Sequence, residues 1–288
     1  MNTSNISVLS RSNVHVSGRG QQVLLLLHGM GCTQSIWQPL LPAFEAHYRV
    51  VRLDLVGAGH ATDVLEVLRA LDLREVVLVG HSIGAMIGVL AAVREPARFA
   101  RLVLLAPSPR FLNGRDYTGG FEAADVEELL LSLEKNQDEW AQAFAPILVG
   151  ETNRPDLIMA ISSSFASTNP GVLRHLARVA FLNDSRPALP LLHTPALVVQ
   201  PARDALVPLG VGYYLHEQLA DSQLVIIDTS GHFPHLTAPE ATLAAMGRFL
   251  GSPLALPAGT SQHWAMPGCA AALFGGRAAG PARFTAVS

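Results

Sequence analysis

The chain has 288 residues, of which 49% are hydrophobic and 15% are charged, and its net charge is −3. This balance gives no electrostatic reason to expect a nucleic acid or an anionic membrane as a partner. Two cysteines are too few for a disulfide framework and no zinc-ligand spacing occurs, so we expect no metal and no other cofactor. The apolar run nearest the N-terminus, Val23 to Leu27, is too short for a signal or membrane segment, and we expect a cytoplasmic protein.

Apolar runs alternate with helical stretches through residues 1–110, and the alternation resumes over residues 191–250. This pattern predicts one α/β core with a mostly parallel central sheet flanked by helices. Residues 111–190 interrupt the core, and their helical periodicity predicts a lid of four short helices. The helical blocks of this insertion are Val126 to Lys135, Asp138 to Leu148, Asp156 to Phe165 and Val172 to Phe181. The tail, residues 251–288, is rich in Ala, Gly and Pro, so we expect it to be disordered.

A serine lies at a strand-to-helix turn near the middle of the core. The β-branched run Val76 to Val79 predicts a strand buried on both faces, and Gly80-His-Ser-Ile-Gly84 follows it. This is the GxSxG form of a nucleophile elbow, in which glycines two residues before and after the serine avoid a collision of their Cβ atoms with neighbouring backbone. Ser82 is therefore the predicted nucleophile.

A serine hydroxyl needs a base that takes its proton and an acid that orients the base. In this architecture both follow the nucleophile in the chain, each on a loop after a core strand. The predicted strand Ala196 to Gln200 leads to Asp204, and the predicted strand Leu224 to Asp228 leads to His232. We predict Asp204 as the acid and His232 as the base.

Two competitors remain open for these roles. Asp228 could replace Asp204, but it ends a strand only four residues before His232, which favours a role in closing the loop. His235 could replace His232, but it follows Pro234 at the start of a helix, where a core histidine is the ordinary interpretation.

Acyl transfer also needs N–H donors for the developing oxyanion. One normally comes from the residue after the nucleophile, here Ile83, and one from the loop after an early strand. The strand Val23 to Leu27 runs into His28-Gly-Met-Gly-Cys32, so Met30 is the second predicted donor. Cys32 is expected to pack in this loop rather than to react.

Aromatic side chains of the lid indicate an apolar ligand cavity opposite Met30 and Phe233. Trp140 and Phe144 share a helix face because they lie at positions i and i+4. Packing between lid helices is an equal alternative for such a pair. The predicted pocket residues are Trp140, Phe144, Phe181 and Phe233.

Several stretches of the chain resemble the RsbQ-type α/β-hydrolases, which include bacterial energy-stress regulators of sigma-B signalling and the related plant karrikin and strigolactone receptors. They are His28–Trp37, Asp54–His60, Gly80–Gly84, Ala106–Pro109, Gly119–Phe121 and Gly231–His235. The resemblance implies the α/β-hydrolase fold with a helical lid. It also places the triad on Ser82, Asp204 and His232 and the oxyanion amides on Met30 and Ile83.

One departure from that family lies after His60. Family members continue with a polar and aromatic segment, whereas here Ala61 leads directly into the helical stretch Thr62 to Leu71. The connection is still long enough for a parallel crossover. Because this loop lies near the ligand entrance, the resemblance is a better guide to the triad of this chain than to its substrate preference.

Two classes of function follow. The first is a serine hydrolase that cleaves a small hydrophobic ester or lactone through an acyl-enzyme. The second is a signalling module that binds such a molecule with little turnover and engages a partner, for which the resemblance implies a PAS-domain phosphatase. A metabolic enzyme of the enol-lactonase or haloperoxidase type is a third option, but it lacks the Gly-Cys-Thr-Gln-Ser-Ile-Trp stretch.

Overall fold

The structure is a computed structural model that describes residues 8–55, 61–150 and 154–259. Its centre is a seven-stranded sheet in the order β1-β3-β2-β4-β5-β6-β7. Neighbouring strands are parallel except β1, which runs antiparallel to β3. The strands are β1 (His15–Ser17), β2 (Val23–Leu27), β3 (Arg49–Arg52), β4 (Val76–His81), β5 (Phe99–Leu105), β6 (Ala196–Arg203) and β7 (Ser222–Ser230).

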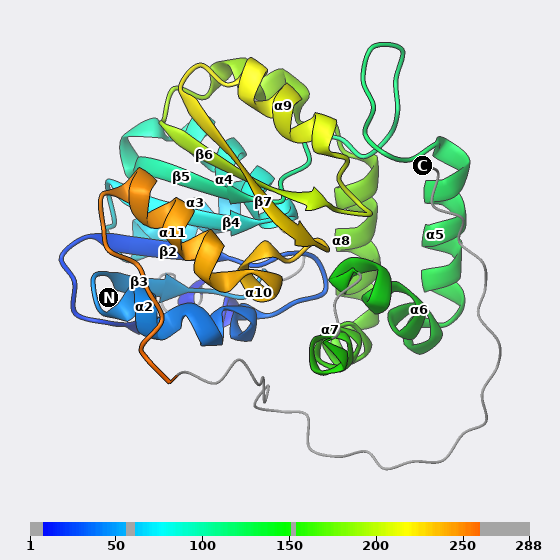
Figure 1. The fold of residues 1–288 in the computed structure, drawn as a ribbon, viewed down its shortest axis with the longest axis horizontal. Coiled ribbons are helices and arrows are strands. Elements are labelled where there is room, and N and C mark those ends of the chain that lie inside the picture. Colours follow the sequence, from blue (N-terminus) through cyan, green and yellow to red (C-terminus); the bar gives the residue numbers. More distant parts are fainter. Residues whose placement is uncertain (1–7, 56–60, 151–153, 260–288) are drawn as a thin grey trace.

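Helices cover both faces of this sheet (Figure 1). Every residue of β2 and β4 is buried, as their unbroken apolar sequences predict for strands covered on both sides. One face carries α3 (Ala61–Ala70), α4 (Ile83–Arg94) and α9 (Leu209–Gln218), and the other carries α2 (Leu41–Glu45), α10 (Pro234–Thr237) and α11 (Pro239–Leu250). The 3₁₀ helices are η1 (Gln34–Leu40), η2 (Pro96–Arg98) and η3 (Arg186–Leu191).

Four helices form the insertion between β5 and β6. They are α5 (Ala123–Lys135), α6 (Gln137–Val149), α7 (Pro155–Ser167) and α8 (Pro170–Leu182). Their first turns carry strong start signals: the side chains of Asn136 and Asn169 accept backbone N–H groups, and a proline opens both α7 and α8. The helices stand at the end of the sheet towards which the arrowheads of the parallel strands point (Figure 1).

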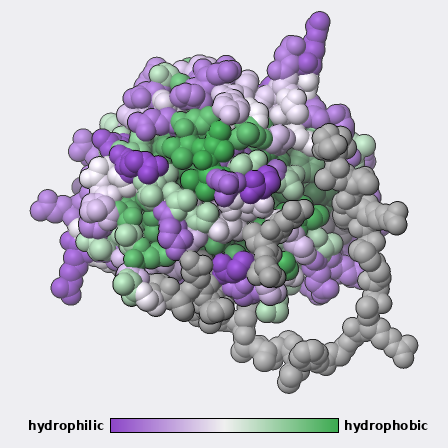
Figure 2. Space-filling view, viewed as in Figure 1, coloured by the Kyte–Doolittle hydropathy of each residue, from purple (hydrophilic) through white to green (hydrophobic). Residues whose placement is uncertain are grey.

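Two strands extend beyond the segments expected from sequence. β6 continues past Gln200 to Arg203, with an irregularity in its pairing between Pro201 and Arg203, and β7 spans Ser222–Ser230. β7 is one of the two edge strands, and its Ile226 is 40% exposed. Apolar residues gather around this edge, beside α9, on the face shown in Figure 2.

Two expectations fall on parts of the chain that the structure does not describe. The departure around His60 lies partly in residues 56–60, and most of the tail lies in residues 260–288. Residues 251–259 are described, and within them Leu254 is buried against the core.

Candidate active site

Ser82 occupies a strained turn between β4 and α4. Its φ of 55° and ψ of −123° lie outside the regions that L-residues ordinarily adopt, and its N–H is held by the carbonyl oxygen of Leu105 at 2.9 Å. A Cβ atom on Gly80 would come within 2.6 Å of Ala85 backbone, and one on Gly84 within 2.5 Å of the His28 carbonyl oxygen. The two glycines therefore let the turn close around the serine.

The structure brings Ser82, His232 and Asp204 into one row. The Ser82 hydroxyl lies 2.8 Å from Nε2 of His232, and Nδ1 of His232 lies 2.7 Å from Oδ2 of Asp204. The Asp204 side chain is fully buried, and its Oδ1 accepts the N–H groups of Leu206 and Val207 at 2.9 and 3.2 Å. The carboxylate is thus fixed by the loop after β6, so that Nδ1–H of His232 donates to it and Nε2 is free to accept from the serine.

Neither competitor occupies this row. The Asp228 side chain is 89% exposed and pairs with Arg203 at 2.9 Å. His235 is completely buried in α10, where its ring stacks on Trp37 with 4.8 Å between centroids. Burial is the main cause that lowers the pKa of His235 to about 3, with a smaller contribution from His232.

The two predicted oxyanion donors lie beside the serine. Ile83 is the first residue of α4, so its N–H has no acceptor within the helix. Met30 follows β2 in a loop that Gly31 turns with a φ of 67°, and its side chain lines the same cavity as Ser82. The close approach of Gly84 to His28 shows that this loop packs against the start of α4.

Two other side chains of the loop have structural roles. His28 donates from Nδ1 to the Gly29 carbonyl oxygen at 2.8 Å and accepts the Leu55 N–H at Nε2 at 2.9 Å. Burial raises the pKa of Cys32 to about 12, so its thiol stays protonated and unreactive.

A small, mainly apolar cavity opens beside the serine hydroxyl. Its enclosed volume is about 20 Å³, which holds little more than one water molecule. The core and the lid both contribute to its walls. The lining residues are Met30, His81, Ser82, Phe111, Leu148, Phe165, Ala180, Phe181, Leu206, His232 and Phe233.

The four predicted pocket residues fall into two pairs in the structure. Phe181 and Phe233 line the cavity, but Trp140 and Phe144 do not. They pack behind Phe165, with ring centroids 5.2 and 6.3 Å from it. Phe165, predicted only as the last residue of a lid helix, is the aromatic residue of α7 that lines the cavity. Helical spacing identified the shared face of Trp140 and Phe144 but not what that face meets.

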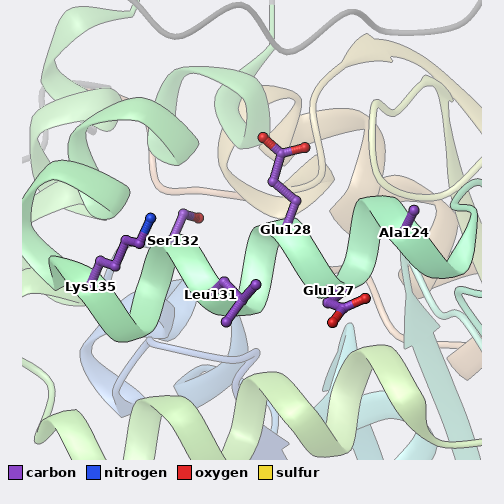
Figure 3. A pocket seen from close by; sticks show the side chains of 6 residues that line it. All are labelled: Ala124, Glu127, Glu128, Leu131, Ser132 and Lys135. Atoms are coloured by element: carbon purple, nitrogen blue, oxygen red, sulfur yellow. The ribbon is translucent and has the colours of Figure 1, made fainter.

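A wider hollow lies apart from the triad, along α5 (Figure 3). It encloses about 350 Å³ and is open to solvent. All of its lining side chains come from this one helix, including the half-exposed Leu131, and none is a histidine, aspartate or cysteine. The hydroxyl of its one serine, Ser132, donates to the Leu129 carbonyl oxygen of the same helix at 2.8 Å, and we assign the hollow no part in the chemistry.

Neither a metal centre nor a membrane span is found in the part of the chain that the structure describes. There, no three His, Cys, Asp or Glu side chains are grouped so that they could bind a metal ion. No helix of that part is both long and apolar enough to cross a bilayer.

A parallel sheet with a nucleophile elbow after its central strand and with acid and base on later strand ends defines the α/β-hydrolase fold. A model of the alpha/beta hydrolase family matches residues 24–245. The chain belongs to this family and is an ester hydrolase by class.

Similar proteins are known from plants and bacteria. The chain is 36% identical over 262 residues to strigolactone esterase D14 of Arabidopsis thaliana, and the match covers 85% of this chain and 96% of the relative. It is 32% identical over 262 residues to karrikin insensitive 2 receptor CA of Petunia hybrida, with 85% and 97% covered. A solved hydrolase from Oleispira antarctica superposes with a TM-score of 0.81 at 35% identity, covering 86% of this chain and 96% of that one.

Proposed function

We propose that this protein hydrolyses a small hydrophobic ester or lactone with Ser82 as nucleophile, His232 as base and Asp204 as the acid that orients it. The observation that carries the proposal is the unbroken row of hydrogen bonds from Ser82 Oγ to His232 at 2.8 Å and from His232 to Asp204 at 2.7 Å. Such a row of serine, histidine and aspartate catalyses acyl transfer by a known order of steps.

The reaction proceeds in two half-reactions. Nε2 of His232 takes the hydroxyl proton while Oγ of Ser82 attacks the ester carbonyl carbon, and the N–H groups of Ile83 and Met30 stabilise the resulting oxyanion. The proton then passes to the leaving alcohol oxygen as the carbon–oxygen bond breaks, which leaves an acyl-enzyme. A water molecule gives its proton to His232 and attacks the acyl carbon, and the proton returns to Oγ as the acid is released. Asp204 stays ionised throughout and stabilises the charged imidazole.

The cavity supports a small hydrophobic substrate. Beyond the triad, its walls are aliphatic and aromatic except for His81. Because its volume of about 20 Å³ holds little more than one water molecule, a substrate must displace the lid or the wall side chains to enter. The names of two relatives support the substrate class, since one is named a strigolactone esterase and another a karrikin insensitive receptor, after small organic molecules.

A signalling role like that of the RsbQ-type proteins is the second candidate. The observation that favours it is the likeness to a protein named as a receptor, with 32% identity over 85% of this chain. In this role, the cytoplasmic protein binds the same small molecule in the same cavity and then engages a partner such as a PAS-domain phosphatase. Ligand-dependent capture of a purified PAS-domain phosphatase tests it, and equal capture with and without an ester ligand counts against it.

The hydrolase assignment is tested with a serine-directed fluorophosphonate probe. We expect the wild-type protein to be labelled on Ser82 and the Ser82→Ala variant to remain unlabelled, because only the activated serine attacks phosphorus readily. Equal labelling of both proteins, or no labelling of the folded wild type, overturns the assignment.

A further inference from the structure

All four polar groups of His232 are held by different parts of the protein. Its side chain meets Ser82 and Asp204, as described above. Its backbone N–H donates to the carbonyl oxygen of Leu148 at 2.7 Å, and its backbone carbonyl oxygen lies 2.8 Å from Nε2 of His81. The base is thus clamped through both its ring and its peptide groups.

His81 is the residue directly before the nucleophile, and only 1% of it is exposed. Because a carbonyl oxygen can only accept, Nε2 of His81 must carry the hydrogen that it donates to His232. The ring of His81 lies against three other rings, with centroids 5.0 Å from His232 and 4.8 Å from both Phe233 and His235. Residues 81 and 82 therefore contact the same base, one at its backbone and one at its imidazole.

We propose that His81 is a positioning residue, which fixes the distance between Ser82 and His232 by holding the backbone carbonyl group of the base. The inference rests on the proposed function, because it concerns the same nucleophile and base. The hydrogen bond closes a ring of contacts that runs from His81 through the peptide to Ser82, across to the imidazole of His232 and back through its carbonyl group. In such a ring the backbone of the base cannot move away from the serine without breaking a buried hydrogen bond.

The loop that carries the second oxyanion donor also meets His81. A Cβ atom on Gly29 would lie 2.6 Å from Nδ1 of His81, so only glycine leaves room for this ring. The ring thus lies where the elbow, the base loop and the oxyanion loop come together. A change in the His81 side chain acts on the base first, because the hydrogen bond of His81 is accepted by the backbone carbonyl oxygen of His232.

His81 also has the charge state that this position needs. Burial, followed by the nearby rings of His235 and His232, holds the pKa of His81 well below its ordinary value, whereas its hydrogen bond to His232 acts in the opposite direction. A neutral ring donates through a single nitrogen and adds no positive charge beside His232 when the base becomes an imidazolium ion. This state supports the geometric argument but does not replace it.

A matched pair of variants tests the role of the hydrogen bond. His81→Gln and His81→Met have side chains of the same length and both lack the ring, but only glutamine offers a donor at the place of Nε2. We expect the kcat of His81→Met, per site titrated with a fluorophosphonate, to fall about 10- to 100-fold with KM within about twofold of wild type. The kcat of His81→Gln should be at least about tenfold higher than that of His81→Met, while the two variants have similar Tm values.

Equal kcat values of folded His81→Gln and His81→Met overturn the inference, since the donor would then have no effect on the base. If His81→Met does not fold, His81→Phe takes its place, and a kcat equal to that of His81→Gln has the same meaning. The wild-type and Ser82→Ala proteins run alongside. An inactive wild type refutes the proposed function. An active wild type together with equal kcat values of the two His81 variants refutes only the positioning role.

Discussion

Acid should destabilise this protein through a histidine that takes no part in the chemistry. His235 is fully buried, and neither ring nitrogen has a hydrogen-bond partner among the described residues. Burial lowers its pKa from 6.5 to about 3. Below about pH 6.5 this ring is therefore protonated in the unfolded chain but not in the folded protein. The free energy of unfolding falls as the pH falls. The loss continues until the pH reaches the folded pKa.

The size of this effect follows from the two pKa values. One pH unit within the window corresponds to about 1.4 kcal/mol, so lowering the pH from about 7.5 to about 5 costs about 2 kcal/mol through His235 alone. His235→Leu removes the proton site from both states. We expect the wild-type stability to fall by about 2 kcal/mol more than that of the variant over this range.

Urea unfolding at several pH values measures this difference, with the free energy of unfolding extrapolated to water at each pH. His47→Gln is the control for the replacement of a histidine at an exposed position. The remaining acid sensitivity of His235→Leu is expected to come partly from His28 and His81, whose pKa values burial also lowers. Parallel curves for wild type and His235→Leu would refute the reasoning.

Three further outcomes follow from the site. Asp204→Asn should lower kcat for a simple p-nitrophenyl ester about 10³- to 10⁴-fold, whereas Asp228→Asn, at an exposed position, should change it less than about twofold; the reverse order contradicts the assignment of the acid. Across p-nitrophenyl esters of increasing acyl length, kcat/KM should rise and then fall, and Phe165→Ala should move the optimum to longer chains while Phe144→Ala, behind the cavity wall, should not; a flat profile argues against a small closed pocket. Ser164→Ala removes the hydroxyl that donates to the Gly31 carbonyl oxygen at 2.8 Å, and urea unfolding should show a loss of about 0.5 to 1.5 kcal/mol, because the Thr168 hydroxyl lies 3.3 Å from the same oxygen and can still donate to it; an unchanged midpoint contradicts this.

The sequence predicts the row of Ser82, His232 and Asp204 because each residue lies just after a recognisable apolar strand. The carboxyl ends of neighbouring parallel strands meet at one edge of a sheet, so residues there gather even when they are far apart in the chain. Ser82 and His232 are 150 positions apart and 2.8 Å distant. The order of the strands along the chain and the position of each residue in the loop after its strand are sufficient for this prediction. Both can be read from the sequence.

The cavity wall could not be predicted in the same way. Spacing shows that Trp140 and Phe144 share a face of α6, but whether that face meets a ligand depends on how the lid helices pack against one another. Here α7 comes between, and Phe165 takes the inner place. The contribution of His81 is hidden for a similar reason, since its partner is the backbone of a residue 151 positions away.

Strand ends were also underestimated, and β6 shows why. Pro201 has no N–H, which argues against a strand, yet pairing continues past it to Arg203. β5 pairs with β6 only as far as Val199, so the residue after Gln200 faces a single neighbour and its missing donor costs little. The extra residues carry the chain to the loop of Asp204.

In the described part of the chain, a hydrogen bond joins the lid to the loop that carries His232. The carbonyl oxygen of Leu148, at the end of α6, accepts the N–H of His232, and the Leu148 side chain also lines the cavity. A Cβ atom on Gly231 would lie 2.2 Å from the Val149 carbonyl oxygen, so the base loop and the helix end are in direct backbone contact. The end of α6 can leave this place only by exposing or abandoning the His232 N–H, at a cost of about 1 to 3 kcal/mol where water does not replace the bond. A ligand that contacts Leu148 would therefore act on His232, the proposed base, so the proposed hydrolysis and the proposed ligand sensing would share one physical basis in this site.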